Sequence, residues 1–585
     1  MRSGFRKKSS KRRIYKKISL IALGFIVIIF IYFYVALGEL NIFVKKYYKI
    51  SGFPFSERNY LILLQNNSEL RPTGGFISAY GIITFKSGFL TNVEIHDSYD
   101  QINKISSPAP YPLSELLSGP TYPGHGFRDA NFNPDFFSSI IDLQYFFSRA
   151  YPEVKLDGVF AIDLKFIENI LKMTGPIQAE SDLFTGENIF TKLEQQVSDI
   201  DLHNIDAINS RKDILKRFAG ALMKKASFKL TRPSKIKEVV INNLDQKHIL
   251  LFFFDPKIND FIVKNNWNGA LKNKGGDFVG VIEANLGGMK SDRYIKRSIN
   301  YEIDLNNQNA NQEYSQIDAS LKITIEHGGA QNTPLSGWYQ GWIRPFIPEG
   351  AQIKSLQIHD QNFQIVNFID DKSKLLKINH FDQVNNLVAP GIRINMNPGE
   401  KRIISLKYSL PSRILANNTY KLYLRKQPGT DLDYYSVIIK APLESSMTSE
   451  EFEVKEDRAF FSGFLKTDKS LQLQIYPDKS PPRIIQQNIP ELNHIKVTFN
   501  EPINQNSAYY IEIFDTDLKN PNLKEQIIFE KYYFSDPRTL DIITSGMNNQ
   551  KEEHYIIKLY GINDLNGNLT SENPRQITAV YRYGL

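Results

Sequence analysis

The feature that most constrains this chain is a run of 21 residues without a charge, from Ile18 to Gly38. At ~1.5 Å rise per residue, a helix of this length matches the ~30 Å hydrocarbon core of a bilayer. Nine Lys or Arg and no acid precede the run in residues 1–17. The positive-inside rule therefore predicts a basic cytoplasmic tail at 1–17, a transmembrane helix at 18–38 and the bulk of the chain outside the cytoplasm.

Two alternatives for this segment are a cleaved signal peptide and a buried core helix. The apolar region of a signal peptide is shorter, about 7 to 15 residues, and ends at a small-x-small site. Leu37, Gly38, Glu39 and Leu40 make a poor site of that kind. No second apolar run approaches this length, so we expect a single-pass protein of the cell membrane whose partner is the lipid bilayer.

Charge and cysteine content exclude several function classes. The net charge of +8 is smaller than the positive charge of the tail alone, so the rest of the chain is close to neutral. The basicity is therefore confined to the tail, and we expect no nucleic-acid partner. Zero Cys excludes disulfides, thiolate metal sites and a Cys nucleophile.

A length of 585 residues predicts several domains. Strand and helix patterns alternate over residues 50–285, which predicts an α/β head domain. The expected elements are a buried strand at 60–64, a hairpin of 76–85 and 89–95, a helix after Pro134, a strand at 157–163 with a helix ending at Gly175, a capping box at 210–213, and strands at 249–254 and 278–282.

Beyond about residue 290 the apolar pattern changes to period two. Leu321, Ile323 and Ile325 share one face of a predicted strand, and Gly, Pro and Asn turns separate such strands. We expect a β-sandwich region at 290–475 and, after a boundary near Ser480, a second β-sandwich at 481–585. The predicted fold class is multidomain α/β plus all-β, with an N-terminal transmembrane helix.

Four segments carry a resemblance to a known family. They are NNSELRPTGGFISAYG (66–81), RDANFNPDF (128–136), DGVFAID (157–163) and NLGGMKSDRY (285–294). Together they resemble the uncharacterised bacterial domain-of-unknown-function family 4012. This resemblance implies a membrane-anchored protein of the cell envelope and brings no established reaction.

The head also resembles, more distantly, the LytR-CpsA-Psr phosphotransferases, which attach glycopolymers to the cell wall. The similarity lies in the order of an R-P-T segment, a hairpin ending in IHDSY, and DGVFAID followed by a helix ending TGP. It implies that Arg71 matches the first Arg of that family's pattern and Asp97 the Asp of its second motif. Thr73 stands where the pattern has a Mg²⁺-binding Asp, and His96 replaces its second Arg.

The C-terminal segment is similar to the bacterial Ig-like domains of surface proteins. The likeness rests on VTFNEPIN (497–504) and YGINDLNGN (560–568). It implies a spacer or adhesion module without an active site.

The residue types of the head predict a phosphotransferase-like site. A pyrophosphate-linked lipid needs guanidinium groups and a divalent cation held by carboxylates. Arg71, Arg128, Asp97 and Asp129 are the predicted catalytic residues, and Asp97 and Asp129 would hold Mg²⁺. Further candidates of the same types are Asp100 and Asp135. In this mechanism an acceptor sugar hydroxyl attacks the neutralised pyrophosphate.

Each of these residues also has a structural interpretation. The structural interpretation is favoured: Arg71 and Asp129 form structural ion pairs, and Gly74, Gly75 and Gly158 satisfy turn and packing geometry. Asp163 is predicted to cap a helix, and His96 to be solvated or packed. We interpret Asn285, Gly287, Gly288, Lys290 and Asp292 as an interdomain turn.

Other motifs indicate no chemistry. The sequence contains no HExxH, Walker A or GxSxG pattern. Asp564, Asn566 and Asn568 imitate a Ca²⁺ loop but favour a tight turn. The aromatic cluster of Trp338, Tyr339, Trp342 and Phe346 favours core packing over sugar stacking.

Two functions follow as hypotheses. The first is an extracytoplasmic envelope protein whose head binds or transfers a cell-wall glycopolymer linked to polyprenyl pyrophosphate. The second is a non-catalytic surface scaffold or adhesion protein.

Overall fold

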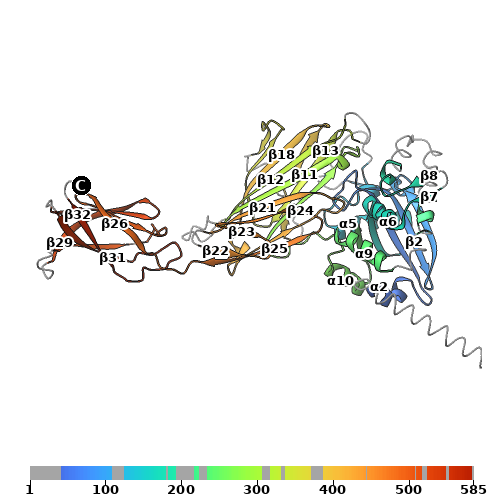
Figure 1. Cartoon of the computed structure of the whole chain (residues 1–585). Helices are drawn as coiled ribbons and strands as arrows, with labels where there is room; N and C mark the ends of the chain where they lie inside the picture. The colour runs from blue at the N-terminus through green and yellow to red at the C-terminus, as the bar shows by residue number, and fades with distance from the viewer. Residues whose placement is uncertain are drawn as a thin grey trace, which may run out of the picture.

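The computed structural model describes residues 41–108, 113, 124–179, 182–192, 217–222, 225, 233–305, 317–330, 336–369, 386–442, 445–507, 509–516, 524–548 and 552–582. These residues form three successive parts. A head with a five-stranded sheet is followed by a β-sandwich and then by a C-terminal β domain, which stands apart at the end of a thin connection (Figure 1).

The head is built on one mixed sheet with the strand order β3-β2-β1-β6-β9. Its central strand β1 pairs antiparallel with β2 and parallel with β6. The bounds are β1 (Glu57–Asn66), β2 (Phe76–Lys86), β3 (Phe89–Asp97), β6 (Leu156–Asp163) and β9 (Ile249–Phe253). Two short hairpins, β4 (Ser106–Ser107) with β5 (His125–Gly126) and β7 (Ile177–Ala179) with β8 (Asp182–Phe184), flank it.

Helices cover both faces of the head sheet. The apolar side of α5 (Phe136–Ala150) packs in one core with Leu61, Val159 and Leu250 of the sheet. The opposite core holds Tyr60 and Phe253 together with residues of α9 (Pro233–Asp245) and α10 (Pro256–Lys264). The remaining helices are α2 (Asn41–Lys45), α3 (Tyr47–Ile50), α6 (Leu164–Thr174), η2 (Gln101–Lys104) and η3 (Phe127–Asp129).

Several local predictions for the head are confirmed. The hairpin turns at residues 87–88, where Gly88 has a φ of 93° that favours glycine. Asp163 caps α6, because its carboxylate accepts a hydrogen bond from the amide of Phe166 at 3.0 Å. The helix then ends at Gly175, whose φ is 85°.

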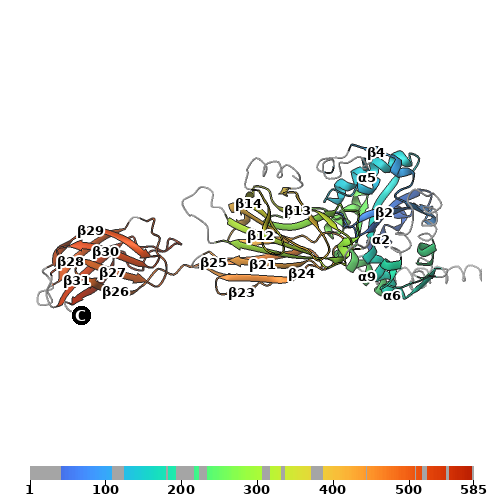
Figure 2. The ribbon, with the colours of Figure 1, turned by 90° about the horizontal axis from the view of Figure 1, so that it is seen from above.

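The middle part is a sandwich of two eight-stranded sheets. One sheet contains β10 (Asp277–Asn285), β13 (Tyr339–Pro348), β16 (Leu387–Val388), β17 (Ile392–Met396), β19 (Leu415–Ala416), β20 (Thr419–Leu424), β22 (Ser445–Thr448) and β25 (Lys469–Pro477). The other contains β11 (Ile295–Asp304), β12 (Ile317–His327), β14 (Gln352–His359), β15 (Ile365–Ile369), β18 (Lys401–Leu410), β21 (Tyr434–Lys440), β23 (Glu453–Lys455) and β24 (Arg458–Phe464). Short 3-10 turns are η5 (Ser291–Tyr294) and η6 (Ser412–Ile414). Figure 2 shows the sandwich between the head and the C-terminal domain.

The period-two pattern of β12 produces the sandwich core. Leu321, Ile323 and Ile325 are fully buried, whereas Lys322 and Glu326 on the other face are exposed. One core cluster joins residues of both sheets, as expected for a sandwich. Tyr339, Trp342 and Phe346 are buried, so core packing is confirmed for them, while Trp338 remains 42% exposed.

The C-terminal part has seven strands in the order β26-β27-β30-β29-β28-β31-β32. They are β26 (Ile484–Glu491), β27 (His494–Phe499), β28 (Tyr510–Thr516), β29 (Lys524–Asp536), β30 (Thr539–Ser545), β31 (Glu552–Tyr560) and β32 (Arg575–Arg582), around a core of their own. Asp564 forms the predicted tight turn, in which its carboxylate accepts from the amides of Asn566 and Asn568, both at 2.8 Å.

The predicted fold class, α/β plus all-β with a transmembrane helix, is wrong because it assigns too much helix to the chain. The chain is a multidomain, β-rich protein, with 50% of the described residues in strands and 18% in helices. Apolar residues at helical spacing around α5 and α6 indicated an α/β head, but the head sheet contains a single parallel pair of strands, β1 with β6. The strand expected at 278–282 belongs to the sandwich, where β10 pairs with β13 and β20.

The N-terminal transmembrane helix in that prediction receives no support. Among the residues that the structure describes, no helix is both long and apolar enough to cross a membrane. The predicted tail at 1–17, the predicted helix at 18–38 and the capping box at 210–213 lie outside the described residues.

Candidate functional site

Two of the predicted motifs, 66–81 in the head and 285–294 in the sandwich, meet at the junction between these two parts. The amide of Asn285 donates to the carbonyl of Leu70 at 2.9 Å, and the amide of Leu70 donates to the carboxylate of Asp292, also at 2.9 Å. The amide of Asp292 in turn donates to the carbonyl of Ser68 at 3.1 Å. The backbone of the head loop is therefore bonded directly to the turn that follows β10.

Arg71 is the central side chain of this junction. It is 5% exposed, and its guanidinium donates to Glu69 at 2.9 Å and to the backbone carbonyl of Asn285. The guanidinium also lies over the ring of Phe76, 5.2 Å from its centroid. Burial raises the pKa of Glu69, although Arg71 opposes that rise. Arg71 thus joins head to sandwich, as in the structural ion-pair interpretation.

A buried charge cluster lies directly behind Arg71. Arg297 of β11 forms ion pairs with Glu283 of β10 and, at 2.8 Å, with Asp292, and Asp433 lies 3.8 Å away. Burial raises the pKa of Glu283 to about 7, although Arg297 opposes that rise. Three acids therefore share one guanidinium, and its loss would be costly because an unpaired buried charge costs several kcal/mol or more.

The segment 425–433, which the sequence analysis did not single out, completes the junction. The side-chain amide of Gln427 donates to the carbonyls of Arg71 at 3.2 Å and Glu283 at 2.8 Å. Gly429 lies so close to the head that a Cβ there would stand 2.0 Å from the carbonyl oxygen of Gly74. The available sequence signal was the charged run that follows the apolar strand β20.

A second group of buried charges fastens the other side of the head. The ammonium of Lys247 is fully buried and lies 2.6 Å from the carboxylate of Asp468. His248 lies between Asp163 at 2.7 Å and Asp431 at 3.0 Å. Burial lowers the pKa of His248, but the two carboxylates outweigh burial and the net pKa is raised. Lys247 and His248 belong to the head, whereas Asp431 and Asp468 belong to the sandwich.

The other predicted catalytic residues lie near one edge of the head sheet. Asp97 ends β3 and is 1% exposed, and its carboxylate accepts from the amide of Tyr99 at 2.9 Å. Arg128 is half-buried, with its guanidinium 4.8 Å from the centroid of the Tyr99 ring. Asp129 is 6% exposed and contributes to the raised pKa of Glu69. Tyr99 thus contacts both Arg128 and Asp97. Glu69 pairs with Arg71 and lies within electrostatic reach of Asp129.

The remaining candidates have structural partners. Asp135 caps α5 through the amide of Ser138 at 3.1 Å and also accepts from the amide of Leu271 at 2.9 Å. Asp100 caps η2 by accepting from the amide of Gln101. Of the two structural roles predicted for His96, solvated or packed, the structure shows the packed one: its imidazole stacks on Tyr80, with 5.1 Å between the ring centroids.

The described residues contain no group of three or more His, Asp or Glu arranged to hold a metal ion. Asp97 and Asp129 remain the predicted pair for Mg²⁺, which takes oxygen ligands in octahedral geometry and keeps several waters. Lys290, from the 285–294 motif, lies within electrostatic reach of Glu69, and burial lowers its pKa.

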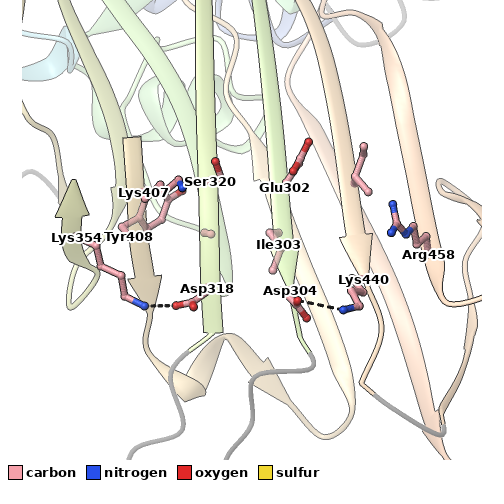
Figure 3. Close-up of a pocket in the computed structure, with 12 residues that line it drawn as sticks. Glu302, Ile303, Asp304, Asp318, Ser320, Lys354, Lys407, Tyr408, Lys440 and Arg458 are labelled. Atoms are coloured by element: carbon pink, nitrogen blue, oxygen red, sulfur yellow. Dashed lines mark hydrogen bonds and ion pairs between the residues drawn. The ribbon is translucent and has the colours of Figure 1, made fainter. Parts of the chain in front are cut away.

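The sandwich has a separate shallow depression of about 290 Å³ on the sheet that contains β11 and β12. Lys354 of β14 pairs with Asp318 of β12 across the intervening strand β18, and Lys440 of β21 lies 3.4 Å from Asp304 on the neighbouring strand β11 (Figure 3). Lys407 and Arg458 also line it. The depression offers polar and charged groups, without a paired acid and base poised for catalysis.

Comparison with known proteins finds one family model that matches part of the chain. Residues 56–197 match the model described as "Protein of unknown function (DUF4012)". The matched range includes the motifs at 66–81, 128–136 and 157–163. No curated protein matches the chain.

Solved structures give only weak likenesses. The Lin1025 protein from Listeria innocua is 12% identical, with 38% of this chain and 85% of that one covered and a TM-score of 0.22. The transcriptional regulator yvhJ from Bacillus subtilis is 10% identical, with 32% and 76% covered and a TM-score of 0.18. The N-terminal part of the bacterial S-layer protein SbsC is 16% identical, with 18% and 24% covered and a TM-score of 0.16. TM-scores this low do not establish a shared fold.

Proposed function

We propose that this chain is a non-catalytic scaffold of the bacterial cell envelope, in which the head and the sandwich act as one rigid unit that displays the C-terminal β domain. The observation that carries this proposal is the placement of Arg71. Its guanidinium is buried between Glu69 and the carbonyl of Asn285, where it holds the sandwich and is not presented to a ligand. Three donor contacts of this guanidinium go to Leu70, Asn285 and Glu69, and burial shields the side chain from a pyrophosphate in solvent.

The neighbouring contacts support the same role. Asn285 donates its side-chain amide to Asp292 at 2.8 Å, and Asn67 donates to the carbonyl of Gly429 at 3.1 Å. The side-chain amides of these motif residues therefore form hydrogen bonds within the junction between head and sandwich. The extracytoplasmic location remains a proposal from the composition of residues 1–38, which is basic and then apolar.

A second function is binding or transfer of a glycopolymer linked to polyprenyl pyrophosphate. It is favoured by the half-buried Arg128 beside Tyr99, close to Asp97 and Asp129. The resemblance to LytR-CpsA-Psr phosphotransferases supports the same candidate, and Mg²⁺ on the two carboxylates would supply charge neutralisation.

One experiment separates the two functions. The thermal stability of the full chain is measured with and without Mg²⁺ and a polyprenyl pyrophosphate, for the wild type, Arg71→Ala and Arg128→Ala. The scaffold proposal expects Arg71→Ala to lower the melting temperature by several degrees, because Glu69 is left buried and unpaired, while ligand and Mg²⁺ change nothing. Mg²⁺-dependent stabilisation of the wild type that Arg128→Ala abolishes would overturn the scaffold proposal in favour of the second function.

A further inference from the structure

Aromatic side chains gather on the end of the head that is remote from the sandwich. We define the aromatic surface by six exposed apolar side chains: Tyr47, Tyr48, Phe53, Phe55, Phe89 and Leu90. Phe55 is 92% exposed and Phe89 is 73% exposed. Large apolar groups clustered in this way on a protein surface mark an interaction site, because their exposure to water is unfavourable.

The two segments that form this surface are fastened together. The hydroxyl of Tyr47 donates to the carbonyl of Gly88, and the amide of Gly88 donates to the carbonyl of Ser51 at 2.9 Å. The amide of Ser87 donates to the carbonyl of Ser56 at 3.0 Å. The tip of the β2–β3 hairpin and the turn after α3 are therefore bonded to each other, which brings their exposed side chains to one end of the head.

The base of the surface is also tied to the head. The hydroxyl of Tyr60 donates to the carbonyl of Ile50 at 2.8 Å, and Arg58 donates to the carbonyl of Lys49 at 3.1 Å. Lys49 forms an ion pair at 2.7 Å with Asp255, the residue that caps α10. The helices α2 and α10 accordingly lie together at one end of the head (Figure 1).

Positive charge accompanies the exposed rings. Residues 41–58 contain Lys45, Lys46, Lys49 and Arg58 against one acid, Glu57, and Lys86 lies at the start of the hairpin tip. Lys49 and Arg58 are paired with Asp255 and Asp157, and Lys86 lies 3.9 Å from Glu57. Aromatic rings with an amphipathic edge and nearby lysines suit the interface of an anionic bilayer.

The chain that precedes the surface indicates the same partner. The aromatic surface begins at Tyr47, nine residues after the end of the uncharged run 18–38, and nine Lys or Arg precede that run in residues 1–17. An apolar segment of that composition partitions toward lipid, and the aromatic surface follows it within a few residues. A protein partner for the aromatic surface would not require an apolar segment next to it in the chain.

The direction of the strands adds a geometric argument. β1 begins at Glu57 beside the aromatic surface and ends at Asn66 beside the sandwich junction. At ~3.3 Å per residue these ten residues separate the two ends by about 30 Å. A bilayer that contacts one end therefore leaves the junction and the sandwich free of lipid.

We propose that the aromatic surface docks the head onto the surface of an anionic lipid bilayer. The rings insert at the level of the headgroups, and the lysines contact the lipid phosphates. This inference concerns the orientation of the head at a membrane and does not depend on whether the head is a scaffold or an enzyme.

The absence of Cys allows a direct test on the full chain. Phe55→Cys and Leu90→Cys each carry one spin label, and Ile485→Cys, an apolar position that is 65% exposed in the C-terminal domain, is the matched control. Each protein is reconstituted in vesicles of phosphatidylglycerol and phosphatidylcholine in equal parts. The collision rates with oxygen, which concentrates in lipid, and with a water-soluble nickel chelate are then measured.

We expect the oxygen-to-nickel ratio at 55 and 90 to rise several-fold above that at 485. Lys46→Glu, added to the labelled Phe55→Cys chain, should lower the ratio without changing the melting temperature. Labels at 55 and 90 that stay as accessible to nickel as the label at 485 would overturn the proposal. Shielding that occurs without vesicles and grows with protein concentration would also overturn it, in favour of a contact between copies of this chain.

Discussion

The two junctions of the molecule are built in opposite ways. The head meets the sandwich among buried charges: Lys247 of the head pairs with Asp468 of the sandwich, Arg71 of the head donates to the carbonyl of Asn285, and Arg297 pairs with the other acids on the sandwich side. The sandwich meets the C-terminal domain through the segment 478–483, where Asn568 donates to the carbonyl of Asp478 at 2.9 Å. The first junction loses stability if any member is removed, whereas the second consists mainly of a short proline-containing spacer. Buried polar contacts fix an orientation, and a spacer fixes only a distance.

The largest expected effect is at the centre of the first junction. Arg297→Ala leaves Glu283, Asp292 and Asp433 buried without their cation, and it should destabilise the head–sandwich unit by about 3–5 kcal/mol. Chemical denaturation of the full chain measures this change. The matched control is Arg575→Ala in the C-terminal domain, whose exposed pair with Glu572 at 2.9 Å should contribute less than about 1 kcal/mol. An equal loss of unfolding free energy in Arg297→Ala and Arg575→Ala would show that the buried charges are no more important for stability than an exposed ion pair.

A pair of glycines tests the close approach of head and sandwich. Gly429 and Gly567 share a φ of 83°, but a Cβ at Gly429 would collide with the carbonyl of Gly74, whereas nothing lies within 4 Å at Gly567. Both Ala variants carry the backbone penalty, roughly 1–2 kcal/mol. Gly429→Ala should cost about 2 kcal/mol more by displacing the backbones, as measured by urea unfolding. A similar loss of unfolding free energy in both variants would mean that the head and the sandwich move apart at this point with little energetic cost.

The pH dependence of the first junction should show the contribution of His248. The folded pKa of His248 is raised above its ordinary value, because Asp163 and Asp431 outweigh the effect of burial. Its stabilising effect is therefore present below about pH 6.5 and is lost as the pH rises through the folded pKa. The difference in melting temperature between the wild type and His248→Gln should shrink from about pH 6 to pH 9. Lys165 and Lys426 also face this group. The pKa of Lys165 is raised, so it stays protonated over this range, whereas burial lowers the pKa of Lys426 to about 8, and a difference that grows with pH would assign the dependence to Lys426.

The smallest effect is expected at the second junction. Insertion of Gly-Ser after Ser480 should leave the unfolding free energy of both neighbouring parts within about 0.5 kcal/mol. The same insertion after Gly288, in the turn between Asn285 and Ser291, should lower the stability of the head–sandwich unit, because it shifts the bonds to Leu70 and Ser68. Scanning calorimetry compares the two insertions, and a destabilising effect of the first one would show that the spacer is part of a packed interface.

Local structure was predictable from the sequence where it depends on residues that are close together in the chain. The hairpin at 87–88 follows from Ser-Gly between two apolar runs, and the cap at Asp163 follows from its position before an amphipathic helix. Both features depend on contacts within a few residues, so the sequence pattern contained them.

The roles of the candidate site residues were not predictable in this way. The partners of Arg71 are a carbonyl 214 residues away and a side chain 356 residues away, and residue types alone do not reveal such pairings. The same Arg and Asp residues suit a pyrophosphate site and a buried junction equally well. β10 is likewise buried along its whole length, so its apolar run did not reveal which sheet it joins.

The spacer of Pro481 and Pro482 has a consequence for how the C-terminal domain meets other molecules. Six residues in extended polyproline geometry, at ~3.1 Å each, reach about 19 Å. Any ligand held by the C-terminal domain therefore stays within a narrow shell around the end of the sandwich. Tethering over so short a span gives the C-terminal domain an effective concentration of about 1 mM near the sandwich. A contact with the sandwich that is too weak to form between free molecules would thus be occupied much of the time.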